Sequence, residues 1–146
     1  MSNPTQRDLT SAALISVSSY KPGFSIKQLL DSNLETFWQS DGPQPHYINF
    51  NFKKRTRINT VSVYFDFKQD ESYSPKVISI RMGTNPDTLQ EVAKQEFDEP
   101  SGWIDIPVAG QKTFMIQVAV LVNHQNGKDT HVRGIKLLQS IDPLEE

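Results

Sequence analysis

The sequence predicts an all-β protein, an antiparallel jelly-roll β-sandwich with one short helix near residues 26–31. About eight short segments are apolar or alternate between apolar and polar residues, and they are rich in β-branched and aromatic side chains. Clusters of turn-forming residues separate these segments roughly every ten residues. Strands do not alternate with long helices, which argues against a parallel α/β sheet. Antiparallel strands in about this number suit a jelly roll.

One strand, the helix and a second strand are expected in the first third of the chain. Residues 12–18 carry Ala, Leu, Ile and Val and form the first expected strand. Ser25 and Gln28 have the spacing of a capping box, in which each side chain accepts a backbone N–H at the start of a helix. The polar residues 31–33 end this helix early. Residues 46–52 alternate strictly, which is typical of a half-buried strand.

The remaining expected strands fill the rest of the chain. Residues 58–67 and 77–83 alternate between apolar and polar side chains, whereas 113–122 is one of the most apolar stretches. The pattern of residues 89–97 does not distinguish a strand from a helix. We interpret this segment as a strand, because the turn-forming residues at 99–102 end it too early for a typical helix. The later expected strands therefore cover residues 58–67, 77–83, 89–97, 103–107, 113–122 and 132–139.

Length and composition bound the class of protein. The 146 residues suit one domain, here residues 12–139, between a flexible N-terminus at 1–11 and an acidic tail at 140–146. A net charge of −2 gives no basic excess for general nucleic-acid binding. The chain has no cysteine, which excludes disulfide and thiol chemistry. No apolar run is long enough to span a membrane, and no signal sequence is evident, so an intracellular protein is expected.

Two long polar loops are the candidates for function. Residues 123–131 connect two strongly β-prone segments, which we interpret as neighbouring strands, with more residues than a tight hairpin needs. Residues 68–75 form the second polar loop. Such loops on a rigid scaffold commonly carry binding groups. The basic run at 53–57 could contact an anionic partner, although a solvated turn is the favoured interpretation.

Catalysis and metal binding fit these loops poorly. His124 and His131 flank Asp129, but their spacing matches no metal signature, so no metal or other cofactor is expected. Ser72 could pair with either loop histidine and an aspartate, yet no nucleophile elbow is present. Asp70 and Glu71 are adjacent, so their carboxylates diverge and do not suit glycoside hydrolysis.

Recognition is the remaining chemistry. Trp38 and Trp103 could be exposed binding aromatics, but the apolar neighbours Phe37 and Ile104 favour plugging the ends of the sandwich. The Asn, Gln, His, Ser, Tyr and Asp side chains of the loops are directional donors and acceptors. They suit a peptide backbone or a sugar.

Five stretches, in order along the chain, resemble the DOC domain family of anaphase-promoting complex subunit 10. The resemblance covers about residues 12–138 and is carried by residues 33–42, 70–75, 99–104, 113–117 and 123–131. It implies a discoidin-like, galactose-binding-like jelly roll and a non-enzymatic role in a cullin–RING ubiquitin ligase. It also implies that the protein binds destruction-box degrons together with a WD40 coactivator and promotes processive ubiquitination in mitosis, in the nucleus and cytoplasm.

The resemblance implies a set of degron-binding residues, which are assigned here by matching positions. They are Ser72, Tyr73, His124, Gln125, Asn126, Asp129 and His131. The implied partners also include TPR and cullin subunits of the complex, with no nucleic acid and no membrane. Family members commonly end in an Ile-Arg dipeptide that docks in a TPR subunit. Because this sequence ends in Leu144-Glu145-Glu146, either that tail has been removed or this protein docks in the complex differently. A carbohydrate-binding module of the same fold is the alternative function.

Overall fold

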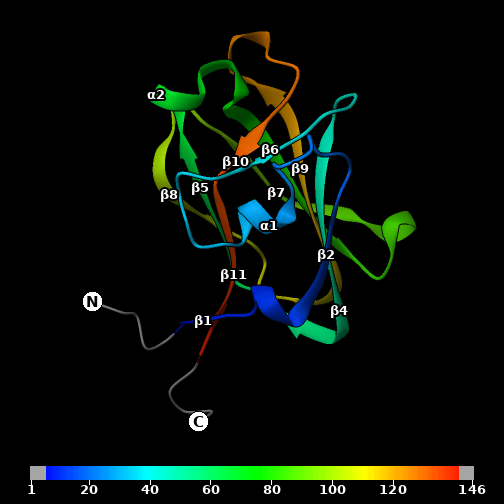
Figure 1. The fold of residues 1–146 in the computed structure, drawn as a ribbon. Helices are drawn as coiled ribbons and strands as arrows, with labels where there is room; N and C mark the ends of the chain where they lie inside the picture. The colour runs from blue at the N-terminus through cyan, green and yellow to red at the C-terminus, as the bar shows by residue number, and fades with distance from the viewer. Residues whose placement is uncertain (1–5, 142–146) are drawn as a thin grey trace.

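Two antiparallel β-sheets face each other across a hydrophobic core in the computed structural model, which describes residues 6–141 (Figure 1). The five-stranded sheet has the order β2 (Ala13–Val17), β4 (His46–Arg57), β9 (Lys112–Asn123), β6 (Pro75–Gly83) and β7 (Gln90–Glu96). The four-stranded sheet has the order β1 (Gln6–Asp8), β11 (Gly134–Ser140), β5 (Thr60–Asp66) and β8 (Ser101–Pro107). A two-stranded ribbon joins β3 (Trp38–Gln39) to β10 (His131–Val132).

The predicted fold class is confirmed, and each expected strand corresponds to one of the longer strands. Alternation placed the buried faces correctly: Ile48, Phe50 and Phe52 of β4 are buried, as are Ile78 and Ile80 of β6. Burying a side chain of this size contributes about 1.5–3 kcal/mol, so these buried faces of the five-stranded sheet supply a large part of the driving force for the sandwich. No helix in the described part of the chain is long and apolar enough to cross a membrane.

The predicted capping box begins α1 (Ile26–Leu29). The N–H of Lys27 donates to Ser25 Oγ, and the N–H of Ser25 donates to Gln28 Oε1 at 2.8 Å. A second single-turn helix, α2 (Phe67–Asp70), forms where a polar loop was expected, with Asp66 as its N-cap. Single 3₁₀ turns complete the structure: η1 (Thr10–Ala12), η2 (Glu71–Tyr73), η3 (Pro86–Thr88) and η4 (His124–Asn126).

Three expectations need revision. Residues 6–11, expected within a flexible N-terminus at 1–11, include β1 and the start of η1, and β1 pairs with β11; residues 1–5 and 142–146 lie outside the described residues. The basic run at 53–57 belongs to β4 rather than to a turn. Trp103, expected to plug an end of the sandwich, is instead 41% exposed on β8. Its ring lies against Gly134, and Lys136 Nζ is 4.5 Å from the ring centroid. Trp38 is fully buried, as expected.

The strands on either side of the 123–131 loop are not neighbours. β9 belongs to the five-stranded sheet, whereas β11 belongs to the four-stranded sheet. The loop therefore crosses from one sheet to the other at one end of the sandwich, and β10 pairs with β3 on the way. Apolar character at the two strands could not distinguish a sheet-crossing connection from a hairpin, because both strands are buried in either case.

Candidate functional site

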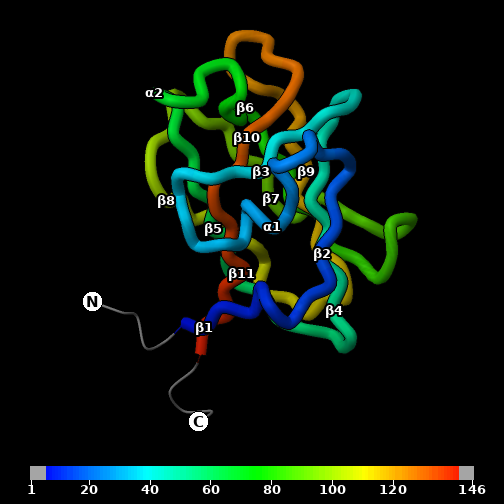
Figure 2. Tube along the Cα trace, viewed as in Figure 1, coloured from blue at the N-terminus to red at the C-terminus, as the bar shows by residue number. Residues whose placement is uncertain are grey.

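The two polar loops lie side by side at one end of the sandwich (Figure 2). The backbone N–H of His124 donates to Ser74 O at 2.9 Å, and the Thr130 hydroxyl donates to Tyr73 O at 3.3 Å. Gly127 is so close to the η2 turn that a β-carbon at this position would come within 1.8 Å of the Ser72 carbonyl oxygen. Residues 70–74 and 123–131 therefore form one continuous surface, which we call the paired-loop surface.

The 123–131 loop is held from beneath by hydrogen bonds to its own backbone. The buried Asn123 amide donates to Gly127 O at 3.2 Å and to Asp129 O at 3.0 Å. The buried His46 imidazole donates from Nε2 to Lys128 O at 2.5 Å. These donors hold the path of the loop beneath its exposed tip. A loop that is held in place before binding loses less conformational entropy when a partner binds.

A stack of rings forms the wall beside the loops. The His131 imidazole lies between Phe37 and Tyr73, with centroid distances of 3.9 Å and 4.1 Å and nearly parallel planes. Phe24 extends the stack, 5.0 Å from Phe37. Tyr73 is the outermost ring and is 39% exposed. An exposed aromatic side chain, Tyr73, thus lies beside the polar loop tip and is backed by the stacked rings of His131 and Phe37.

A buried ion pair anchors this stack to the sandwich. Arg133 donates to both oxygens of Asp70, from Nε at 2.9 Å and from Nη2 at 2.7 Å. His131 donates from Nδ1 to Asp70 Oδ1 at 2.9 Å, and its Nε2 lies 3.0 Å from Gln39 Oε1. Burial alone would raise the pKa of Asp70, but the hydrogen bonds and positive charges of Arg133 and His131 outweigh it and lower the pKa.

The lowered pKa of Asp70 predicts an acid-sensitive contribution to stability. Because the folded-state pKa lies below the ordinary 3.8, the ionised carboxylate stabilises the fold above about pH 4. That stabilisation is lost as the pH falls from 3.8 through the folded-state value. The melting temperature of the wild type should therefore exceed that of Asp70→Asn near neutral pH, and the difference should shrink near pH 3. A difference that is constant over this range would contradict the assignment.

The sequence-predicted site residues separate into an exposed and a buried group. Gln125 and Asn126 are exposed at the loop tip with left-handed φ values of 56° and 58°, and Ser72 is half-buried beside them. Asp129 is half-buried and accepts from the Ser40 hydroxyl at 3.1 Å. His124 is buried, donates from Nδ1 to Ser74 O and accepts from the Glu99 N–H at Nε2.

Both loop histidines thus support the surface from within rather than point into solvent. Consecutive left-handed residues other than glycine store strain of about 1–3 kcal/mol each, which persists only where surrounding contacts impose it. The structure brings all the predicted residues to one end of the molecule. Sequence reasoning missed Phe37, Gln39, Gly127 and Arg133. Only Gly127 gave a sequence signal, as a glycine within a polar loop.

The arrangement suits recognition more than reaction. In the described residues no group of three metal-ligating side chains comes together. The carboxylate of Asp70 is fully committed to Arg133 and His131. What the surface offers is exposed amide and hydroxyl groups next to one aromatic face, and such groups bind polar extended ligands.

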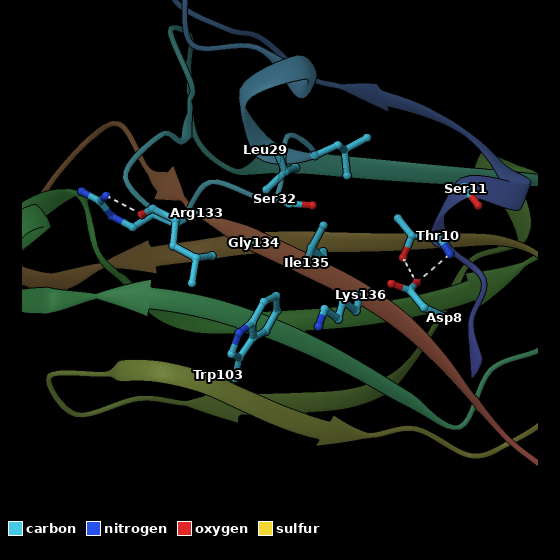
Figure 3. Close-up of a pocket in the computed structure, with 12 residues that line it drawn as sticks. Asp8, Thr10, Ser11, Leu29, Ser32, Trp103, Arg133, Gly134, Ile135 and Lys136 are labelled. Atoms are coloured by element: carbon cyan, nitrogen blue, oxygen red, sulfur yellow. Dashed lines mark hydrogen bonds between the residues drawn. The ribbon is translucent and has the colours of Figure 1, made fainter. Parts of the chain in front are cut away.

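A separate hollow of about 480 Å³ lies on the four-stranded sheet below α1 (Figure 3). Trp103 and Lys136 lie on its floor, and Leu29 and Ser32 lie across from them. Arg133 links this hollow to the paired-loop surface, because its Nη1 donates to Leu34 O at 2.9 Å while its other nitrogens bind Asp70. None of the sequence-predicted site residues lines the hollow.

Comparison with known proteins places the chain among close relatives. The family model described as "Anaphase-promoting complex, subunit 10 (APC10)" matches residues 2–145. Anaphase-promoting complex subunit 10 of Homo sapiens is 52% identical over 147 residues, which cover 97% of this chain and 78% of the relative. The Schizosaccharomyces pombe subunit 10 is 43% identical, with 89% and 72% covered. Subunit DOC1 of Saccharomyces cerevisiae is 36% identical, with 89% and 55% covered.

Several solved structures with the same fold are carbohydrate-binding modules. A family 32 module from Clostridium perfringens NanJ, in complex with galactose, has a TM-score of 0.76 and 11% identity, covering 92% of this chain and 99% of the module. A second Clostridium perfringens module, in complex with GalNAc-β-1,3-galactose, has a TM-score of 0.77 and 10% identity, covering 92% and 100%. At these identities the likeness shows the fold alone, the expected galactose-binding-like jelly roll.

Proposed function

This chain belongs to the anaphase-promoting complex subunit 10 family, and on that basis we propose that it is a non-catalytic substrate-recognition subunit of this ubiquitin ligase. In this role the chain works with other components of the complex. Its paired-loop surface binds destruction-box degrons together with a WD40 coactivator and so promotes processive ubiquitination.

The observation that carries the proposal is the junction of two loops into one preorganised polar surface. Ser72 and Asn126 come from loops that are separated by β6 to β9 in the chain, yet Gly127 packs directly on Ser72. An extended peptide presents alternating N–H and C=O groups. The exposed amides of Gln125 and Asn126 can both donate to and accept from such a backbone.

A second receptor makes a weak site useful. A shallow surface with a few exposed polar groups gives low affinity by itself, because each hydrogen bond contributes only about 0.5–1.5 kcal/mol net. When a coactivator holds another part of the same segment, the second contact becomes intramolecular and the combined affinity rises by orders of magnitude. A longer bound lifetime then allows more ubiquitin transfers per encounter.

Removing the polar side chains of Ser72 and Asn126 should weaken degron binding without unfolding the protein. We expect Asn126→Gly and Ser72→Ala each to lower affinity for a destruction-box peptide about threefold to tenfold, the loss of one net hydrogen bond. Glycine is preferred to alanine at position 126 because the φ of 58° would strain alanine. Fewer ubiquitins should be added per binding event when the variants are assembled into the ligase.

Matched controls lie on the sheets, away from the loops. Asn51→Ala in β4 and Ser16→Ala in β2 remove the same kinds of exposed side chain and should leave processivity unchanged. Chemical-shift titration with the peptide, with and without a coactivator WD40 domain, should move signals near Ser72 and Asn126. Equal processivity of ubiquitination in the wild type and in both loop variants would overturn the assignment of the degron-binding site to this surface. Shifts caused by galactose instead of the peptide would favour the carbohydrate-binding alternative.

A further inference from the structure

A groove lined by five cationic side chains lies at the opposite end of the sandwich from the paired-loop surface. It has a volume of about 610 Å³, and its cations are Arg7, Lys54, Arg55, Arg57 and Lys112. Lys112 begins β9 and Asn123 ends it. At about 3.3 Å per residue, this strand places the groove more than about 30 Å from the loop tip. We call this site the basic groove.

The two sheets together build the basic groove. β4 shifts register against β9 between Asn51 and Thr56, and this irregularity pushes the basic run out of the regular ladder. Arg57 then pairs with Lys112 across the strands, so two cations are neighbours. Arg7 comes from β1 in the other sheet, where it pairs with Gln139. The Gln139 amide donates to Arg57 O at 3.0 Å and joins the two sheets at this seam.

The charge of the basic groove contrasts with that of the rest of the chain. It holds five of the 15 Lys and Arg residues, and no Asp or Glu lines it. The other ten cations stand against 17 acidic residues, so the remainder of the chain carries seven excess negative charges. Within residues 6–141 both ion pairs of the structure involve Asp70, and neither includes a cation of the groove. Like charges are therefore gathered here without a counter-charge from the described residues.

We propose that the basic groove is a second interaction surface that binds a short Asp- and Glu-rich segment of a neighbouring protein. All five cations are exposed on long flexible side chains, which suits several carboxylates spread along a peptide rather than one small oxyanion in a tight cradle. Leu9 and Ile141 also line the groove and can contact the aliphatic parts of side chains in such a segment. A long nucleic acid would extend beyond the groove onto the acidic remainder of the chain and be repelled there.

Fluorescence polarisation with a labelled octapeptide of alternating Glu and Asp tests this proposal on the full chain. We expect saturable binding that weakens as salt rises from about 50 to about 200 mM, because the contacts are between exposed charges. The double variant Arg55→Glu/Arg57→Glu replaces two attractions by two repulsions and should weaken binding about tenfold or more. The neutral variant Arg55→Gln/Lys112→Gln should weaken it less, and it serves as a second probe if charge reversal impairs folding.

A matched double variant separates the groove from general attraction. Lys27→Glu and Lys94→Glu change the net charge equally, at exposed positions on α1 and β7 outside the groove, and should leave the affinity within about twofold of the wild type. Equal weakening in both charge-reversal variants would overturn the proposal, as would no binding at low salt. Tighter binding of a single-stranded oligothymidylate than of the peptide would assign the groove to nucleic acid instead. Unchanged binding of a destruction-box peptide in the groove variants would show that the two surfaces are separate.

Discussion

Replacing Arg133 with methionine should lower the free energy of unfolding by about 3–5 kcal/mol. Asp70 and Arg133 are each only 4% exposed, and the guanidinium makes two hydrogen bonds to the carboxylate. Without Arg133 the carboxylate keeps only His131 as a partner and remains buried with an incompletely balanced charge. For a domain of this size the melting temperature should fall by about 10 °C or more. Thermal and urea unfolding measure both quantities.

Companion variants separate the ion pair from simple loss of side-chain volume. Arg133→Lys keeps the positive charge but cannot bind both oxygens in the same geometry, so it should be intermediate. The double variant Asp70→Asn/Arg133→Met removes both charges and should recover part of the loss. Arg81→Met is the control, because Arg81 donates to the Ser79 and Gln117 side chains and lies over the Tyr47 ring but forms no ion pair with a described carboxylate. A loss as large in Arg81→Met as in Arg133→Met would refute this role for the buried pair.

Substituting alanine for Gly127 should separate the two loops and remove most degron binding. The backbone at Gly127, with φ −62° and ψ 144°, is open to any residue, so conformational strain is not the cause. The added β-carbon would instead lie 1.8 Å from Ser72 O and 2.7 Å from the carbonyl carbon of the same residue. Overpacking of this kind costs about 1–3 kcal/mol. Because the loops can move apart into solvent, most of the effect should fall on the site. We expect peptide affinity to fall more than tenfold, a larger effect than the loss of global stability would suggest.

Gly83→Ala is the control for this effect. A β-carbon there would lie 2.7 Å from Thr88 O, a backbone clash of the same kind but less close than the 1.8 Å at Gly127, where β6 leads to η3. This variant should also lose stability from a backbone clash but keep wild-type affinity for a destruction-box peptide. Peptide titration together with thermal unfolding of both variants provides the comparison. The role of the loop junction would be excluded if Gly127→Ala bound the peptide as well as Gly83→Ala does.

The ion pair and the loop junction act on the same surface in different ways. Arg133 and His131 bind Asp70 at the end of α2, and so they fix where the η2 turn begins. Gly127 sets how closely the other loop approaches that turn. Loss of the ion pair should therefore lower stability and also disturb the geometry of the paired-loop surface, whereas Gly127→Ala should mainly change that geometry. This contrast gives each variant a distinct signature in binding and unfolding measurements.

Local patterns in the sequence determined most of the fold. Strict alternation identified the buried face of β4 through Ile48 and Phe50, because side chains of a pleated strand point to opposite faces at every step. Ser25 and Gln28 identified the start of α1, since a capping box is a contact between residues three positions apart. The two polar loops were each singled out by composition, but only the family resemblance joined them in one candidate site, and no local pattern indicated how they meet.

Tertiary structure alone decided the interior of that region. Asp70 and Arg133 are 63 residues apart, and their pairing depends on the 123–131 connection crossing between the sheets. The same crossing places His131 between Phe37 and Tyr73, and it brings Gly127 onto Ser72. Periodicity reports which face of a strand is buried, but not which strands share a sheet. The sequence therefore determined the strands, the helix cap and the loops, while the choice of sheet for each strand decided which polar side chains could reach one another.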